Sequence, residues 1–186
     1  AFALTKYADK RVTNSLTTIL PKTNGNLRRA IIYAIGEQKD PEALDSLIQV
    51  LSSKDDILTE TLVEAFLKLK NSKTTSFFES MVNQKDVFNR KIALVYLASI
   101  YGHKNALGFM SEEVNEKKKC VEDLQLIDEH YSLKLVKATL LDPSPEIREA
   151  SINLLLGINP IGTSKIISPL VNDDATVVRR VTIRAL

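Results

Sequence analysis

The sequence repeats one pattern six times, at intervals of 28 to 31 residues. The repeats come into register when one residue, which we call the anchor, is aligned in each of them. The anchors are Arg28, Thr59, Arg90, Lys118, Arg148 and Arg179. Positions twelve and eight residues before the anchor, and six and seven after it, are apolar, with Gln125 as the only departure. A stack of structural repeats is therefore the first constraint on this chain.

The spacing of the apolar positions identifies the repeating unit as a pair of helices. Apolar residues three, six or seven after the anchor, and four apart before it, share one face of an α-helix. Pro41 and Pro145 lie where first helical turns should begin, and Gly36, Gly102 and Gly157 follow predicted last turns. Since one hairpin cannot bury its apolar face alone, neighbouring hairpins should stack into a continuous core.

We expect these hairpins to form one continuous domain over residues 1–186. The approximate repeats are 9–39, 40–71, 72–102, 103–131, 132–158 and 159–186. Repeat 103–131 fits worst, because the lysines at 117–119 interrupt its apolar pattern; a degenerate hairpin and a merged, longer helix both fit it. Ala3–Leu4 and Ala185–Leu186 both match the end of a second helix, so we expect an excised stretch of a longer solenoid.

Residues 27–36, running into 40–48, resemble HEAT repeats, especially the short bacterial kind also found in phycobilisome lyase-like proteins. Residues 147–157 and 178–186 are further good matches. The resemblance covers nearly the whole chain. It implies an all-α fold, a right-handed α-solenoid of about six hairpins, whose second helices line its inner, concave side.

The resemblance also implies a ladder of ion pairs along the stack. In HEAT repeats a turn Asp typically pairs with an Arg six residues later, as Asp142 with Arg148 and Asp173 with Arg179 would here. The ladder should be broken or rewired in the first three repeats, where other residues replace the Asp. These residues are Lys22, Ser53 and Gln84.

The inner side offers a candidate binding surface. Residues one and five after each anchor share one solvent-facing stripe of the second helices. We predict that partner binding uses this stripe, with the contact residues Arg29, Tyr33, Glu60, Glu64, Lys91, Val95, Glu149, Asn153, Arg180 and Arg184. Lys119 and Asp123 occupy the same columns in the fourth repeat. Tyr33 and Val95 resemble the aromatic and apolar anchors of binding hot spots.

The charges of the stripe favour a protein or peptide partner over nucleic acid. Net charge is +2, and the stripe alternates basic and acidic residues, whereas a nucleic-acid groove needs a continuous basic track. We therefore expect a non-catalytic, monomeric protein-interaction scaffold. Nucleic-acid binding is the alternative, through the basic residues at 117–119 together with Arg179, Arg180 and Arg184.

The sequence gives little support for an enzymatic function. Deoxyhypusine hydroxylase shares the HEAT architecture but carries His-Glu pairs for iron, whereas neither His103 nor His130 precedes Glu. A phycobilin lyase-like, chromophore-handling protein is the second alternative, although nothing indicates a bilin pocket. We expect no catalytic residue, cofactor or metal. Cys120 lies beside lysines, which could lower a thiol pKa, but a lone cysteine is more often a core filler.

Composition limits the surroundings of the chain only loosely. One cysteine excludes an internal disulfide, and no apolar run reaches the ~18 residues that span a bilayer, so we expect no membrane insertion. Cytoplasm and periplasm both remain open, with the cytoplasm slightly favoured.

Overall fold

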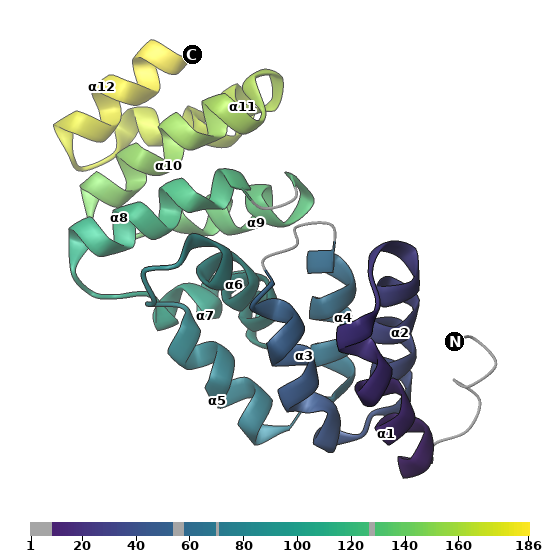
Figure 1. Ribbon diagram of the computed structural model, residues 1–186. Coiled ribbons are helices and arrows are strands. Elements are labelled where there is room, and N and C mark those ends of the chain that lie inside the picture. Colours follow the sequence, from purple (N-terminus) through teal and green to yellow (C-terminus); the bar gives the residue numbers. More distant parts are fainter. Residues whose placement is uncertain (1–8, 54–57, 70, 127–128) are drawn as a thin grey trace. The chain divides into compact units, whose positions relative to one another are not determined.

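The computed structural model describes residues 9–53, 58–69, 71–126 and 129–186, and these residues form helices and turns without a strand (Figure 1). The chain divides into two compact units, residues 1–81 and 82–186, which we call unit 1 and unit 2. Each is described by itself below.

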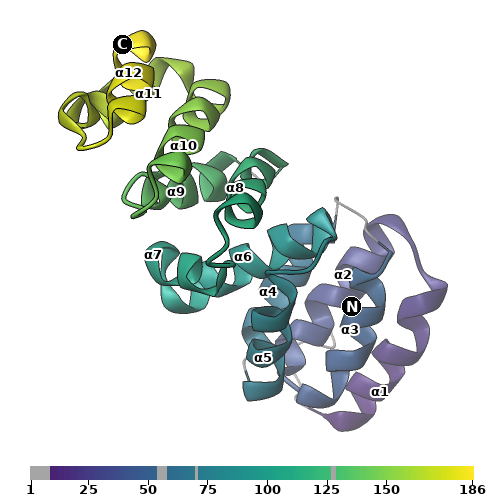
Figure 2. The same ribbon diagram turned by 90° about the vertical axis from the view of Figure 1, so that its left-hand side faces the viewer.

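Unit 1 holds two layers of helices. The first layer contains α1 (Lys10–Ile19), α3 (Leu44–Leu51) and α5 (Ser72–Met81), and the second contains α2 (Gly25–Gln38) and α4 (Thr59–Leu69) (Figure 2). Short 3₁₀ turns, Leu20–Lys22 and Pro41–Ala43, complete α1 and introduce α3. The most extensive packing joins α2 to α4, and α1 and α3 pack beside them.

Capping residues and aromatic packing explain where the helices of unit 1 lie. Asp9 and Asp40 cap α1 and the turn before α3, each accepting a hydrogen bond from the backbone N–H two residues on. Phe66 and Phe78 are fully buried and meet edge to face, with ring centroids 4.9 Å apart.

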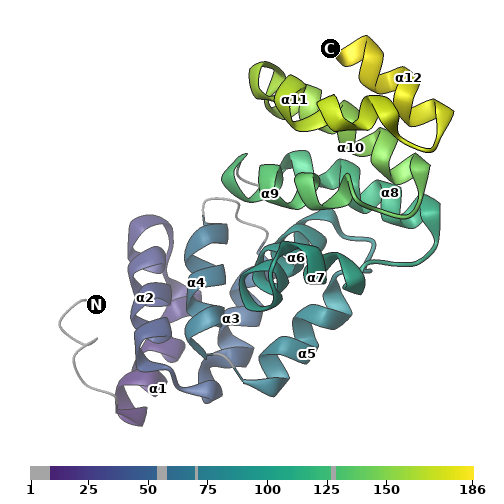
Figure 3. The same cartoon turned by 180° about the vertical axis from the view of Figure 1, so that it is seen from behind.

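Unit 2 continues the succession of helices. Its helices are α6 (Val87–Tyr101), α7 (His103–Ala106), α8 (Val114–Glu122), α9 (Glu129–Thr139), α10 (Pro145–Ile158), α11 (Pro160–Ile167) and α12 (Thr176–Ala185). Three 3₁₀ turns accompany them: Leu107–Phe109, Asp123–Leu126 and Ser168–Asn172. The first helices α9 and α11 lie on one side, opposite α8 and α12 (Figures 1 and 3). Helix α10 packs against both α8 and α12.

The succession of helices in the described residues confirms the predicted all-α solenoid fold, and the repeat bounds stay predictions. Each predicted repeat contains two helices, and only the fifth begins early, because α9 starts at Glu129. The handedness of the superhelix and the single continuous domain stay predictions. Ala3–Leu4, predicted to end a second helix, lies outside the described residues.

The fourth repeat is a shortened hairpin, and its second helix shifts the register by one residue. Arg90, Arg148 and Arg179 are each the fourth residue of a second helix, and in α8 that position belongs to Lys117. The anchor is therefore Lys117 and the choice of Lys118 was wrong, because the first helix of this repeat, α7, has only four residues and the repeat is correspondingly short. With Lys117 as anchor, the fully buried Leu124 replaces Gln125 seven residues after it, and the polar departures become Asp123 and Asn105, six after and twelve before the anchor.

The three glycines predicted to end helices do so in one case only. Gly102 caps α6 with a φ of 82°, where a residue with a Cβ would be strained. Gly36 and Gly157 lie inside α2 and α10, so the prediction was wrong for both. Gly36 instead permits the close approach of α2 to α4, because a Cβ there would lie 2.9 Å from the Cα of Ala65.

This contact predicts opposite effects for the same substitution in two helices. Gly36→Ala should destabilise unit 1 by about 1–3 kcal/mol, because the backbone of α4 must move away. Gly157→Ala, which meets no atom within 4 Å, should stabilise α10 by about 0.5–1 kcal/mol through helix propensity. Urea unfolding followed by circular dichroism measures both. Equal effects would show that α2 and α4 are not in close contact.

Candidate functional site

A common arrangement at the turns fixes the second helices of unit 2. In Arg90, Arg148 and Arg179, Nη1 donates to the backbone carbonyls six and five residues earlier, at 2.7–3.0 Å. Each guanidinium thereby ties the start of its helix to the turn that precedes it. In Arg90 and Arg148 the rest of the planar group binds a carboxylate of the neighbouring repeat, whereas Nη2 of Arg179 donates to Thr176 in its own helix.

The carboxylates of the ladder come from the following repeat. Arg148 donates from Nε and Nη2 to Asp173, at 2.9 and 2.7 Å. Lys117 pairs with Asp142 at 2.5 Å. The predicted carboxylate pairs inside one repeat were therefore wrong, because Asp142 offers Arg148 its backbone carbonyl while its carboxylate faces the preceding repeat.

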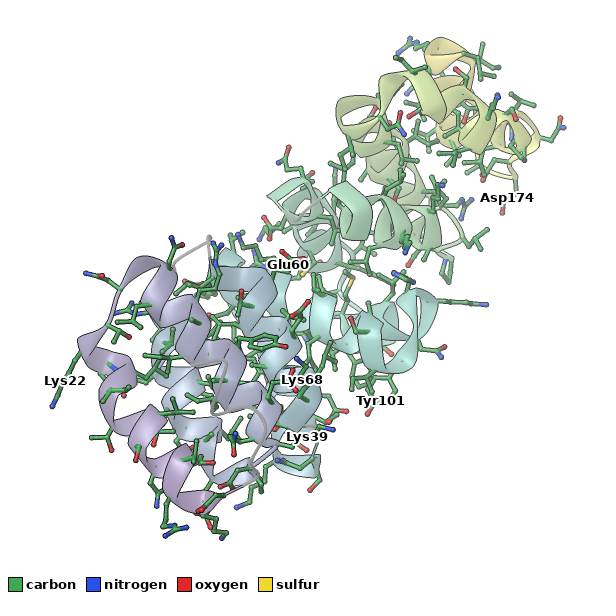
Figure 4. All side chains as sticks on the ribbon, turned by 90° about the vertical axis from the view of Figure 1, so that its right-hand side faces the viewer. Lys22, Lys39, Glu60, Lys68, Tyr101 and Asp174 are labelled. Atoms are coloured by element: carbon green, nitrogen blue, oxygen red, sulfur yellow. The ribbon has the colours of Figure 1, made fainter. Side chains whose placement is uncertain are left out.

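The ladder is rewired where the fourth repeat is short. No Asp is present in the turn at residues 111–113. Arg90 instead binds Asp123, which follows α8. In unit 1 the turn residue that corresponds to Asp173 is Ser53, whose hydroxyl donates to the carbonyl of Val50, and among the described residues Arg28 Nε is buried without a hydrogen-bond partner. Lys22, which replaces the first turn Asp, extends away from unit 1 (Figure 4).

In unit 1 the inner side carries charges that partner one another. Lys68 on α4 bonds to Glu37 on α2 at 2.5 Å and lies 4.5 Å from the ring centre of Tyr33 (Figure 4). The hydrogen bond from Lys68, with a smaller one from Tyr33, holds the pKa of Glu37 below its usual value. Glu60 and Glu64 are exposed on the same helix as Lys68.

In unit 2 the inner side forms a groove between α8 and α10, with a volume of about 260 Å³. We call this the groove of unit 2; it is lined by Lys118, Glu122, Gln125, Glu149, Ala150, Asn153 and Leu154. The predicted contact residues Glu149 and Asn153 meet here. On α8, Lys118 and Glu122 occupy the same two positions, one and five residues after the corrected anchor. On α12 these positions are occupied by Arg180 and Arg184.

The polar side chains at these positions of α8, α10 and α12 do not pair with one another. We define the inner row of unit 2 as Lys118, Glu122, Glu149, Asn153, Arg180 and Arg184. Within the described ranges, none of these six side chains makes a hydrogen bond or ion pair. At the turns, by contrast, Lys117, Arg148 and Asp173 all form ion pairs and are largely buried.

A family model for HEAT repeats matches residues 13–99, which run from within α1 to within α6. The chain contains HEAT repeats. Among solved structures, human deoxyhypusine hydroxylase in complex with glycerol is similar at 16% sequence identity and a TM-score of 0.39, over 98% of this chain and 75% of that one. No curated protein matches the sequence.

Three residues of the predicted stripe, Lys91, Val95 and Asp123, do not face solvent as expected, and a fourth, Lys119, is exposed but paired. Lys91 and Val95 are only 9% and 4% exposed, and Lys91 lies 4.9 Å from the ring centre of Phe88. Lys119 pairs with Glu116, and Asp123 with Arg90, because the corrected register moves both out of the stripe. The sequence signal for Lys118 and Glu122 was the position of the anchor as fourth residue of the helix, which the short first helix α7 concealed.

The described residues give no sign of a reactive cysteine, a metal site or a membrane-spanning helix. Burial raises the pKa of the Cys120 thiol, against the smaller opposing effect of Arg90. In the part of the chain that the structure describes, no three His, Cys, Asp or Glu side chains gather closely enough to hold a metal ion. None of the described helices is long and apolar enough to cross a bilayer.

The buried pair of Arg148 and Asp173 should make stability depend on pH. Burial alone would raise the pKa of Asp173, but hydrogen bonds from Arg148 and from the backbone N–H of Ala175 bring it below the usual value. A lowered folded-state pKa gives stability above the unfolded-state value of about 3.9 and loses it as pH falls through the folded-state value.

We predict that Asp173→Asn destabilises the protein by about 2–3 kcal/mol at pH 7, because Arg148 loses its buried charged acceptor and keeps only the exposed carboxylate of Asp174. The difference from the native chain should shrink below about pH 4, where native Asp173 itself takes up a proton. Asp174→Asn is the matched control; that side chain is 90% exposed and should cost under about 0.5 kcal/mol. Urea titrations from pH 7 to 2.5 measure all three, and a difference that stays constant would contradict the pairing.

Proposed function

We propose that this HEAT-repeat protein is a non-catalytic scaffold that binds another protein along the inner row of unit 2. One observation carries the proposal: six charged or amide side chains lie beside each other on α8, α10 and α12 without a partner among the described residues. Exposed groups of both signs on a fixed framework suit a surface that carries complementary charges, and they confer specificity and association rate.

Unit 1 is a weaker candidate for the same role. Its inner side already pairs Lys68 with Glu37 and Tyr33, so a partner would have to compete with these contacts. Arg29, Glu60 and Glu64 remain exposed there and extend the predicted contact surface. Lys91 and Val95 are no longer part of the proposal, because both are buried.

Nucleic acid is the less suitable partner because few of the predicted basic residues are available to it. Lys117 is paired with Asp142, Lys119 with Glu116, and Arg179 with the carbonyls of its own turn. Only Lys118, Arg180 and Arg184 remain, and Glu149 lies on the helix between them. A phosphate backbone requires a more continuous basic track.

The groove offers little for catalysis. Its polar lining consists of Lys, Glu, Gln and Asn side chains, without the Ser, Cys or His that commonly form a nucleophile–base pair. Apolar lining, which a chromophore would need, is restricted to Ala150 and Leu154. We therefore propose binding without chemistry, and a monomeric chain.

Affinity capture from a lysate of the source organism tests the proposal. The baits are the native chain, the variant Lys118→Glu/Arg180→Glu, and the control Lys137→Glu/Lys165→Glu, which changes net charge equally on the exposed side of α9 and α11. We expect one protein to be enriched by the native and control chains and to fall at least tenfold with the inner-row variant.

Circular dichroism confirms that each bait is folded, and nuclease treatment of the lysate separates the two candidate partners. Retention of the same protein by all three baits would place binding elsewhere on the chain. Capture that disappears after nuclease treatment would instead support nucleic acid.

A further inference from the structure

The charges of the inner row alternate from one repeat to the next. One residue after the anchor, α8 carries Lys118, α10 carries Glu149 and α12 carries Arg180. Because α10 packs against both α8 and α12, the three positions follow one another in space as basic, acidic and basic. Repulsion between like charges on the outer two helices is thus relieved by the acidic residue between them.

The distance between neighbouring helices favours one conformation of a ligand that binds along this row. Packed helices lie ~8–10 Å apart. An extended polypeptide advances ~3.3 Å per residue, so about three residues cover one repeat. A helical ligand advances only ~1.5 Å per residue and would need six or seven residues to cover the same step.

Amide side chains in the groove also favour an extended backbone. Gln125 and Asn153 both line the groove, and each offers one hydrogen-bond donor group and one acceptor. An extended segment exposes backbone N–H and C=O groups that have no partner of their own. A helix has already used these groups internally, so it would leave both amides unpaired.

We propose, resting on the proposed function, that the groove of unit 2, together with the adjoining part of the inner row on α12, binds an extended segment of the partner protein in which acidic, basic and acidic residues stand three apart. The first acidic residue binds Lys118, the basic residue binds Glu149, and the second acidic residue binds Arg180. Gln125 and Asn153 bind the backbone between them. Glu122 and Arg184, five residues after the anchors, set the preferred chain direction because they differ in sign.

Fluorescence anisotropy with labelled peptides tests this assignment. The first peptide carries Glu, Lys and Glu at three-residue spacing, separated by Thr, Val and Pro, which disfavour a helix. The second exchanges the charges to Lys, Glu and Lys, and the third keeps the composition of the first but places its charged residues side by side. Ionic strength is about 20 mM, because exposed charges are screened at higher salt.

We expect the native chain to bind the first peptide about tenfold more tightly than the second, and several-fold more tightly than the third. The variant Lys118→Glu/Glu149→Lys/Arg180→Glu should reverse the preference between the first two. Lys137→Glu alone changes net charge by the same amount away from the groove and should leave the preference unchanged. Circular dichroism verifies that both variants fold.

The inference is overturned if the first and second peptides bind equally, if the triple variant does not reverse the order, or if neither saturates the native chain by about 1 mM. Tighter binding of a single-stranded oligonucleotide than of any peptide would overturn it as well. If capture of the partner depends on Lys118 and Arg180 while peptide order does not matter, the scaffold function stands and only the extended-segment assignment fails.

Discussion

The second helices of unit 2 depend on a basic residue in their first turn that is shared between two repeats. Its donors bind the carbonyls of the preceding turn, and its remaining charge binds a carboxylate of the following repeat, as Arg148 shows with Asp142 and Asp173. Removing either partner would leave a largely buried charge unpaired, which is costly. The pair thus fixes the position of one repeat on the next more tightly than apolar packing alone would.

This constraint has a consequence for the opposite side of each helix. Because the anchors hold α8, α10 and α12 at equivalent positions, residues one and five places later come to lie in one row. The charges needed for assembly are consumed at the turns, by Lys117 and Arg148 among others. The charges of the inner row form no such ion pairs between repeats among the described residues. We therefore assign the binding function to them.

Sequence periodicity predicted the hairpins because burial acts on every repeat in the same columns, and Ile35, Phe66 and Leu155 are all fully buried. It failed where local geometry departs from the average repeat. The short first helix α7 made Lys118 look like the anchor, and the glycine at the close contact of α2 with α4 looked like a helix end. Periodicity also cannot report what covers a helix, so the burial of Lys91 and Val95 could not be foreseen.

The direction of the ladder is the central claim, and a double-mutant cycle tests it most directly. Unfolding free energies of Lys117→Met, Asp142→Asn, Arg148→Met and the two double variants containing Asp142→Asn give two coupling energies. We predict about 1–3 kcal/mol between Lys117 and Asp142, and less than about 0.5 kcal/mol between Asp142 and Arg148, since that contact uses the backbone carbonyl. A larger coupling of Asp142 to Arg148 than to Lys117 would show that the carboxylates serve their own repeat, and would contradict this account.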